Sequence, residues 1–102
     1  MAEWRLMQGD VLLGELSEYG CDQPFFLARF SPGPGWESAE GLFGALTTLS
    51  GPDPDGSQAA RVMTPLRDLE LTLVPTGGQQ PSLGVFRNCV LRIDGDTARL
   101  RY

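Results

Sequence analysis

The sequence predicts an α+β domain: an antiparallel sheet of about six strands, with elements in the order βββααβββ and two helices packed on one face. Two observations predict it. Segments with strand-like alternation of polar and apolar residues occupy both ends of the chain, and segments with apolar residues at three- and four-residue spacing occupy its middle. A partly closed barrel with helices is the alternative, because several strands are apolar on both sides. A chain of 102 residues can build one core, so we expect a single domain over residues 1–102.

The first two strands are expected at residues 3–8 and 11–19. Gly9 and Asp10 suit a two-residue hairpin loop between them, since Gly accepts the positive φ of a type II′ turn. Pairing across this loop predicts a core face made of Trp4, Leu6, Val11 and Leu13. The opposite face is mixed and carries Glu3, Arg5, Met7, Leu12 and Leu16.

Gly and Pro in residues 20–24 interrupt the sheet before a third strand at residues 25–30. This strand is apolar on both sides, which is typical of a central strand that is covered twice. One side carries Phe26, Ala28 and Phe30, and the other carries Phe25, Leu27 and Arg29. A Pro/Gly turn at residues 31–35 ends the first half of the sheet.

Two helices are expected in the middle of the chain. Ser38 can cap the first, which runs to about Leu49. Its apolar stripe, which fits the inner face of the sheet over Phe26 and Phe30, consists of Leu42, Ala45, Leu46 and Leu49. Ser57 can cap a shorter helix over residues 58–64, and Pro65 ends it.

Three further strands are expected at residues 68–74, 83–93 and 97–102. In the first of them, the side chains that alternate toward the core are Leu69, Leu71 and Leu73. A flexible turn rich in Gly and Pro, at residues 75–81, separates this strand from the last two.

The last two strands form a hairpin whose register is open. A Gly95-Asp96 loop brings Arg92 directly opposite Arg99, which like charges resist, whereas an Asp94-Gly95 loop avoids this contact. In both registers the core face carries Cys89, Leu91, Ile93, Ala98, Leu100 and Tyr102. The other face carries Asn88, Val90, Arg92, Thr97, Arg99 and Arg101.

The charge of the chain indicates which kinds of partner it favours. Eight arginines and no lysine against thirteen acidic residues give a net charge of −5, so nucleic acid and anionic membranes meet a repulsive average field. The absence of Lys beside abundant Gly, Ala, Pro and Arg is typical of a bacterial genome of high GC content. Charge therefore favours a protein partner over a nucleic acid.

The chain has no His, which excludes His-based triads, dyads and general bases and nearly all zinc sites. Its two cysteines, Cys21 and Cys89, match no metal-binding spacing, and we expect two buried thiols, although a disulfide between them stays open. The Asp/Pro/Gly loop at residues 53–57 resembles a calcium loop but lacks the distal Glu, so turn chemistry explains it better. No catalytic residue, metal or cofactor is expected.

Neither a signal peptide nor a membrane-spanning run is present in the sequence. We therefore expect a cytoplasmic protein.

The outer side of the sheet is the candidate binding surface. Arginines and aromatic residues, which are enriched where proteins bind one another, gather there if the sheet is continuous. The residues expected to form it are Phe25, Arg29, Phe86, Arg92, Arg99 and Arg101. Apolar residues expected beside them are Met7, Leu12, Leu16 and Leu27. The alternative is that acidic residues such as Glu3 and Glu70 pair with these arginines across the strands.

Four segments carry a resemblance to known proteins: EWRLMQGD at residues 3–10, FSPGP at 30–34, LVP at 73–75 and LRIDGD at 91–96. With these, the chain resembles small uncharacterised proteins of high-GC actinobacteria over nearly its whole length. The shared residues form turns and strands, so the resemblance implies no activity.

The sequence favours a non-enzymatic domain that binds another protein, or itself as a homodimer, through its outer sheet face. One alternative is a small-molecule binder with a pocket lined by Trp4, Trp36 and the Phe residues, between sheet and helices or inside a curled barrel. Another is an acidic inhibitor or immunity-type partner of a basic protein.

Overall fold

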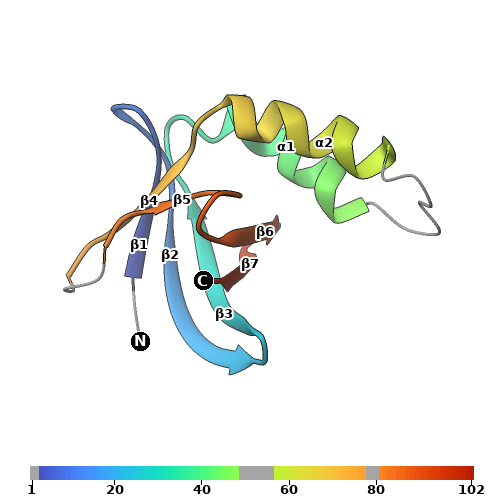
Figure 1. Cartoon of the computed structure of the whole chain (residues 1–102). Helices are drawn as coiled ribbons and strands as arrows, with labels where there is room; N and C mark the ends of the chain where they lie inside the picture. The colour runs from blue at the N-terminus through green and yellow to red at the C-terminus, as the bar shows by residue number, and fades with distance from the viewer. Residues whose placement is uncertain (1–2, 49–56, 78–80) are drawn as a thin grey trace.

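One curled antiparallel sheet and two helices make up the computed structural model, which describes residues 3–48, 57–77 and 81–102 (Figure 1). In the first half of the chain the elements are β1 (Glu3–Gln8), β2 (Val11–Asp22), β3 (Phe25–Pro32) and α1 (Glu37–Thr48). In the second half they are α2 (Ser57–Asp68), β4 (Thr72–Pro75), β5 (Leu83–Gly84), β6 (Val90–Asp94) and β7 (Thr97–Arg101).

The sheet has the strand order β5-β4-β1-β2-β3-β7-β6 and curls into a half-barrel, with the two helices side by side across one end (Figure 1). The predicted α+β class is confirmed. The curvature of the sheet is intermediate between the two expected forms, an open sheet and a partly closed barrel. The described residues form seven strands, so the expected six is wrong.

The additional strand arises because residues 83–93 do not form one strand. The backbone N–H of Gly84 donates to Oδ1 of Asn88 (3.0 Å), and the N–H of Asn88 donates back to the carbonyl of Gly84 (2.9 Å). Phe86 between them adopts a left-handed backbone conformation, with φ of 62°. This tight turn interrupts the expected strand, and β5 and β6 lie at opposite edges of the sheet order.

The core lies between the concave side of the sheet and the helices. α1 packs against α2 and against β6. The largest fully buried side chains come from both layers: Trp4, Leu6, Leu13, Leu16, Phe43, Leu66, Leu73, Leu91 and Leu100. Trp36 at the start of α1 contacts the rings of both Phe30 (4.5 Å between centroids) and Phe43 (5.5 Å).

A β-bulge in the first hairpin changes which residues of β2 face the core. Leu6 pairs with Gly14 but Met7 pairs with Leu12, so Leu13 is an extra residue. Because one extra residue reverses the alternation, Leu16 faces the core and Val11 is 49% exposed. Both predictions for these two residues are wrong.

A second irregularity, at Tyr19, lets β2 continue past Gly20 to Asp22. The expected interruption at residues 20–24 therefore shrinks to the tight turn before β3. Cys21, near this end of β2, is exposed and free, whereas Cys89 is buried and free. The expectation of two buried thiols holds for Cys89 only.

The helices also differ from the prediction at their ends. α1 begins at Glu37, and the hydroxyl of Ser38 donates to the carbonyl of Gly35 (2.8 Å), so it does not cap as expected. α2 continues through Pro65 to Asp68, which carries Leu66 into the core. The strand expected at residues 68–74 consequently starts only at Thr72. Leu49 and the loop at residues 51–56 lie outside the described residues.

Two aromatic residues of β3, Phe26 and Phe30, pack against different parts of the chain. Phe30 lies under the start of α1 through Trp36, as expected. Phe26 does not lie under a helix: its ring stacks on Tyr102 (5.0 Å between centroids). The prediction that α1 covers both rings is wrong for Phe26, because the helices cross only one end of the long curled strands (Figure 1).

Candidate functional site

The last hairpin adopts the register that opposes two like charges. β6 and β7 pair with Arg92 across from Arg99 and with Asp94 across from Thr97, so Gly95 and Asp96 form the loop. This register also pairs Leu91 with Leu100, and both are fully buried. Both registers turn these leucines toward the core, but the observed one places them directly opposite each other. Their packing against each other outweighs the repulsion of two exposed arginines, which is on the order of 0.2–1 kcal/mol.

The outer surface of β3, β7 and β6 carries four exposed arginines, which we call the arginine face: Arg29, Arg92, Arg99 and Arg101. On β3 the neighbour of Arg99 is Leu27, and on β6 the neighbour of Arg101 is Val90. Apolar side chains thus lie between the charges, as the sequence predicts.

Few carboxylates neutralise the arginine face. Asp22 lies 4.0 Å from Arg99, and both side chains are more than half exposed, so the ion pair contributes little. Arg29 instead lies over the ring of Tyr19, 5.7 Å from its centroid. Neither Glu3 nor Glu70, the acids proposed as partners, is paired with an arginine of this face among the described residues.

The structure distributes the six predicted site residues over three neighbouring hollows. Phe25, Arg92 and Arg99 line one groove of about 490 Å³, which extends to Thr47 at the end of α1. Arg29 lines a second hollow of about 460 Å³ together with Tyr19 and Asp96. The first groove is therefore the centre of the predicted surface.

The remaining two predicted residues, Phe86 and Arg101, line a hollow of about 330 Å³ beside α2. Phe86 does not lie on the arginine face, because its left-handed conformation turns the ring toward the core, 6.4 Å from that of Phe43. Arg101 belongs to the arginine face and also lines this hollow beside α2. Leu16 is likewise absent from the outer surface, since it is buried.

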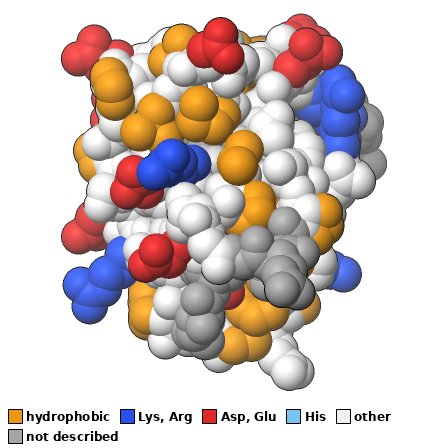
Figure 2. Space-filling model, turned by 90° about the vertical axis from the view of Figure 1, so that its left-hand side faces the viewer, with side chains coloured by type: hydrophobic (Ala, Val, Ile, Leu, Met, Phe, Trp, Pro, Cys, Tyr) orange, Lys and Arg blue, Asp and Glu red, His pale blue; other side chains and the backbone are white. Residues whose placement is uncertain are grey.

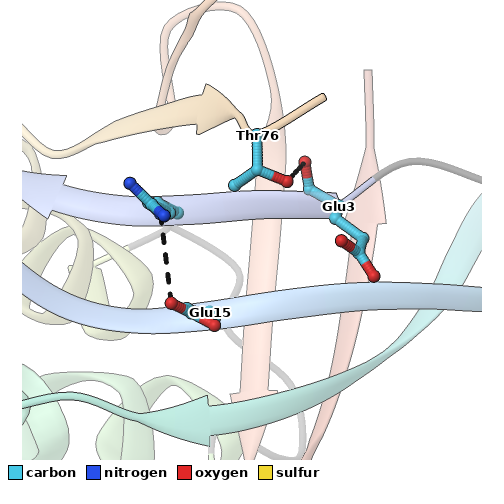
Figure 3. Close-up of polar contacts among 4 residues, drawn as sticks. Glu3, Glu15 and Thr76 are labelled. Atoms are coloured by element: carbon cyan, nitrogen blue, oxygen red, sulfur yellow. Dashed lines mark hydrogen bonds and ion pairs between the residues drawn. The ribbon is translucent and has the colours of Figure 1, made fainter. Parts of the chain in front are cut away.

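The first hairpin forms a contrasting part of the outer surface. There Arg5 pairs across the strands with Glu15, 3.9 Å away, and the hydroxyl of Thr76 donates to the carbonyl of Glu3 (3.4 Å) (Figure 3). Figure 2 shows the side of the molecule on the left of Figure 1, where hydrophobic, acidic and basic side chains are interspersed. Opposite charges are matched on this hairpin.

Sequence reasoning missed one charged residue, Glu18, which is only 9% exposed on the inner side of β2. Its Oε2 atom accepts a hydrogen bond from the indole N–H of Trp4 (2.9 Å) and another from the hydroxyl of Tyr102 (3.2 Å). A buried carboxylate with these donors is satisfied, so it holds the inner side together. Its two-residue spacing from Leu16 places both residues on the same side of β2, but the unpredicted bulge at Leu13 made the expected side of Leu16 wrong.

Two other kinds of site, for a metal ion and for a small molecule between the tryptophans, have little support among the described residues. In the described ranges, no group of three or more Cys, Asp or Glu side chains is placed to hold a metal ion. Trp4 is 1% exposed and Trp36 packs between Phe30 and Phe43, so these side chains fill the core. A small-molecule pocket lined by both tryptophans stays a prediction.

The chain matches no protein-family model, no curated protein and no solved structure. The resemblance to small actinobacterial proteins therefore stays a prediction. Within the described residues, no helix has the length and apolar character needed to cross a membrane.

Proposed function

We propose that the protein is a non-enzymatic binding module that docks an acidic segment of another protein on its arginine face. The observation that carries the proposal is the opposition of Arg92 and Arg99, both exposed, on adjacent strands. Among the described residues, Asp22 is their one ion-pair partner within 4.0 Å, and Asp94 also lines this groove. A carboxylate placed between two guanidinium groups relieves their repulsion and accepts charge-assisted hydrogen bonds from both.

Apolar contacts support a protein rather than a simple ion as the partner. Phe25 and Leu27 are half-buried beside the arginines, and Val90 is 38% exposed. A partner segment that alternates acidic and apolar residues matches this surface, since Arg and aromatic residues carry much of the binding energy in protein interfaces.

Charge argues against the two other occupants. The face holds four of the eight arginines, so the rest of a chain with net charge −5 is more acidic still and repels the long phosphate backbone of a nucleic acid. A two-fold homodimer through this face sets each arginine face against its own copy, and like charges repel. A short acidic segment meets less of this repulsion than a long phosphate backbone, because it contacts the arginine face locally, and it carries no arginine face of its own.

The test is fluorescence anisotropy with a labelled peptide of alternating Glu and Leu residues. We expect saturable, salt-sensitive binding that weakens by about tenfold or more in the double variant Arg92→Glu/Arg99→Glu. The control is Arg5→Glu on the other hairpin, which is compared with the single variant Arg92→Glu of the same charge change and leaves binding within about twofold.

Two comparisons identify the competing occupants. Tighter binding of a single-stranded oligonucleotide than of the peptide, with the same dependence on Arg92, assigns the face to nucleic acid instead. A dimer in analytical ultracentrifugation that dissociates in the Arg92→Glu/Arg99→Glu variant assigns it to self-association. Equal peptide binding by wild type and double variant removes the arginine face as the site.

A further inference from the structure

A groove beside α2 carries a second concentration of positive charge, which we call the helix groove. Three arginines from three separate elements line it: Arg67 in the last turn of α2, Arg87 in the turn after β5, and Arg101 on β7. Its volume of about 330 Å³ is at the small end of the range for ligand sites, roughly 300–1,000 Å³.

Among the described residues, no acidic side chain lines the helix groove. Arg87 lies 3.5 Å from Glu70 outside it, but both side chains are at least 64% exposed, so this pair is weak. Arg67 and Arg101 take part in none of the ion pairs found within 4.0 Å among the described residues. Arg67 and Arg101 thus give the groove positive charge that no ion pair within this distance offsets in the described part of the chain.

The rest of the lining is largely apolar. Met63, Phe86, Cys89 and Val90 contribute to it. Burial raises the pKa of the Cys89 thiol above its ordinary value, so the thiol stays neutral and adds no negative charge to the floor. A ligand that fills the groove therefore needs an apolar body as well as an anionic group.

The turn that supplies Phe86 and Arg87 is preorganised. The N–H of Phe86 donates to the carbonyl of Cys89 (2.8 Å), and the N–H of Arg87 donates to the carbonyl of Gly84 (3.0 Å). The left-handed conformation of Phe86 costs on the order of 1 kcal/mol for a bulky residue, and these hydrogen bonds maintain it. Because the turn is already ordered, a ligand loses little entropy in binding to it.

We infer that the helix groove binds a small carboxylate with an apolar body. The carboxylate accepts hydrogen bonds from the guanidinium groups of Arg67 and Arg101, whose planar donors suit its two oxygens. The hydrocarbon part lies over Phe86 and Met63. This site is separate from the proposed docking of an acidic protein, although Arg101 borders both.

The test uses phenylacetate and octanoate, with 2-phenylethanol and octanol as neutral analogues of the same apolar size. Titration followed by amide chemical shifts is expected to perturb residues 63–67 and 84–90, and calorimetry is expected to show about tenfold weaker binding of the alcohols. Arg67→Gln is expected to weaken carboxylate binding by about tenfold, while the control Arg61→Gln, an exposed arginine on the same helix, leaves it unchanged.

The variants separate this inference from the proposed function. Arg92→Glu/Arg99→Glu, which removes the acidic-peptide site, retains phenylacetate binding, and circular dichroism confirms that each variant is folded. Alcohols that bind as tightly as the acids, an Arg67→Gln variant with undiminished affinity, or shifts confined to residues outside the groove would each overturn the inference.

Discussion

The two hairpins at the ends of the chain differ in how the charges on their outer sides are paired. In β1–β2 the outward Arg5 is paired across the strands with Glu15, whereas in β6–β7 the outward Arg92 is paired with Arg99. The inner sides are alike, because both bury leucines completely. The difference shows that equally buried inner sides can carry matched or unmatched outer charges: Leu91 pairs with Leu100 although this register sets Arg92 against Arg99.

The largest expected effect tests whether the inner sides are equivalent. Leu6→Ala in β1 and Leu91→Ala in β6 each remove a fully buried side chain, so each should lower the free energy of unfolding by about 2–5 kcal/mol. Urea denaturation measures this loss as a lower midpoint at unchanged slope. The control Val11→Ala, at a residue 49% exposed, should cost about 0.5 kcal/mol or less. A loss under about 1 kcal/mol for either leucine contradicts the common role of the inner sides.

A smaller effect tests the charge on the inner side of the first hairpin. Glu18→Ala leaves the buried indole N–H of Trp4 without its acceptor and should cost about 2 kcal/mol. Glu18→Gln retains an acceptor oxygen and should cost less, and Glu15→Ala, on the same strand but exposed, should cost about 0–1 kcal/mol. Equal losses for all three variants, measured by urea denaturation, contradict the structural role of Glu18.

The smallest expected effect comes from reversing one charge on the outer surface of each hairpin. Arg92→Glu creates an opposite-charge pair with Arg99 and should raise the free energy of unfolding by about 0.5 kcal/mol, whereas Arg5→Glu opposes Glu15 and should lower it by a similar amount. Thermal unfolding at low and high salt measures both, and salt should shrink both shifts. If Arg92→Glu is destabilising instead, Arg92 is already stabilised within the folded chain, and the argument for an unmatched pair fails.

Local patterns predicted most of the outward-facing site. Alternation in two short strands placed Phe25, Arg92 and Arg99 on one side, and the structure brings them into one groove. The prediction for Phe86 is wrong because it assumed an uninterrupted strand over residues 83–93. The hydrogen bonds between Gly84 and Asn88 form a turn there instead. The hydrogen bond from Tyr102 to Glu18 could not be foreseen, since it joins residues from opposite ends of the chain, and the one from Trp4 depends on the bulge in β2.

What the sequence determined by itself is the type of each element, the exclusion of His chemistry, and the side of the last hairpin on which its arginines lie. These depend on residue types and on two- and four-residue periods, which are local. Only the tertiary structure decided the bulge at Leu13, the continuation of α2 through Pro65 and the Arg92–Arg99 register. The bulge turns Leu16 toward the core, the longer α2 buries Leu66, and the register of the last hairpin pairs Leu91 with Leu100. These arrangements form because packing apolar side chains is worth more than a helix stop at Pro65 or the separation of two exposed charges.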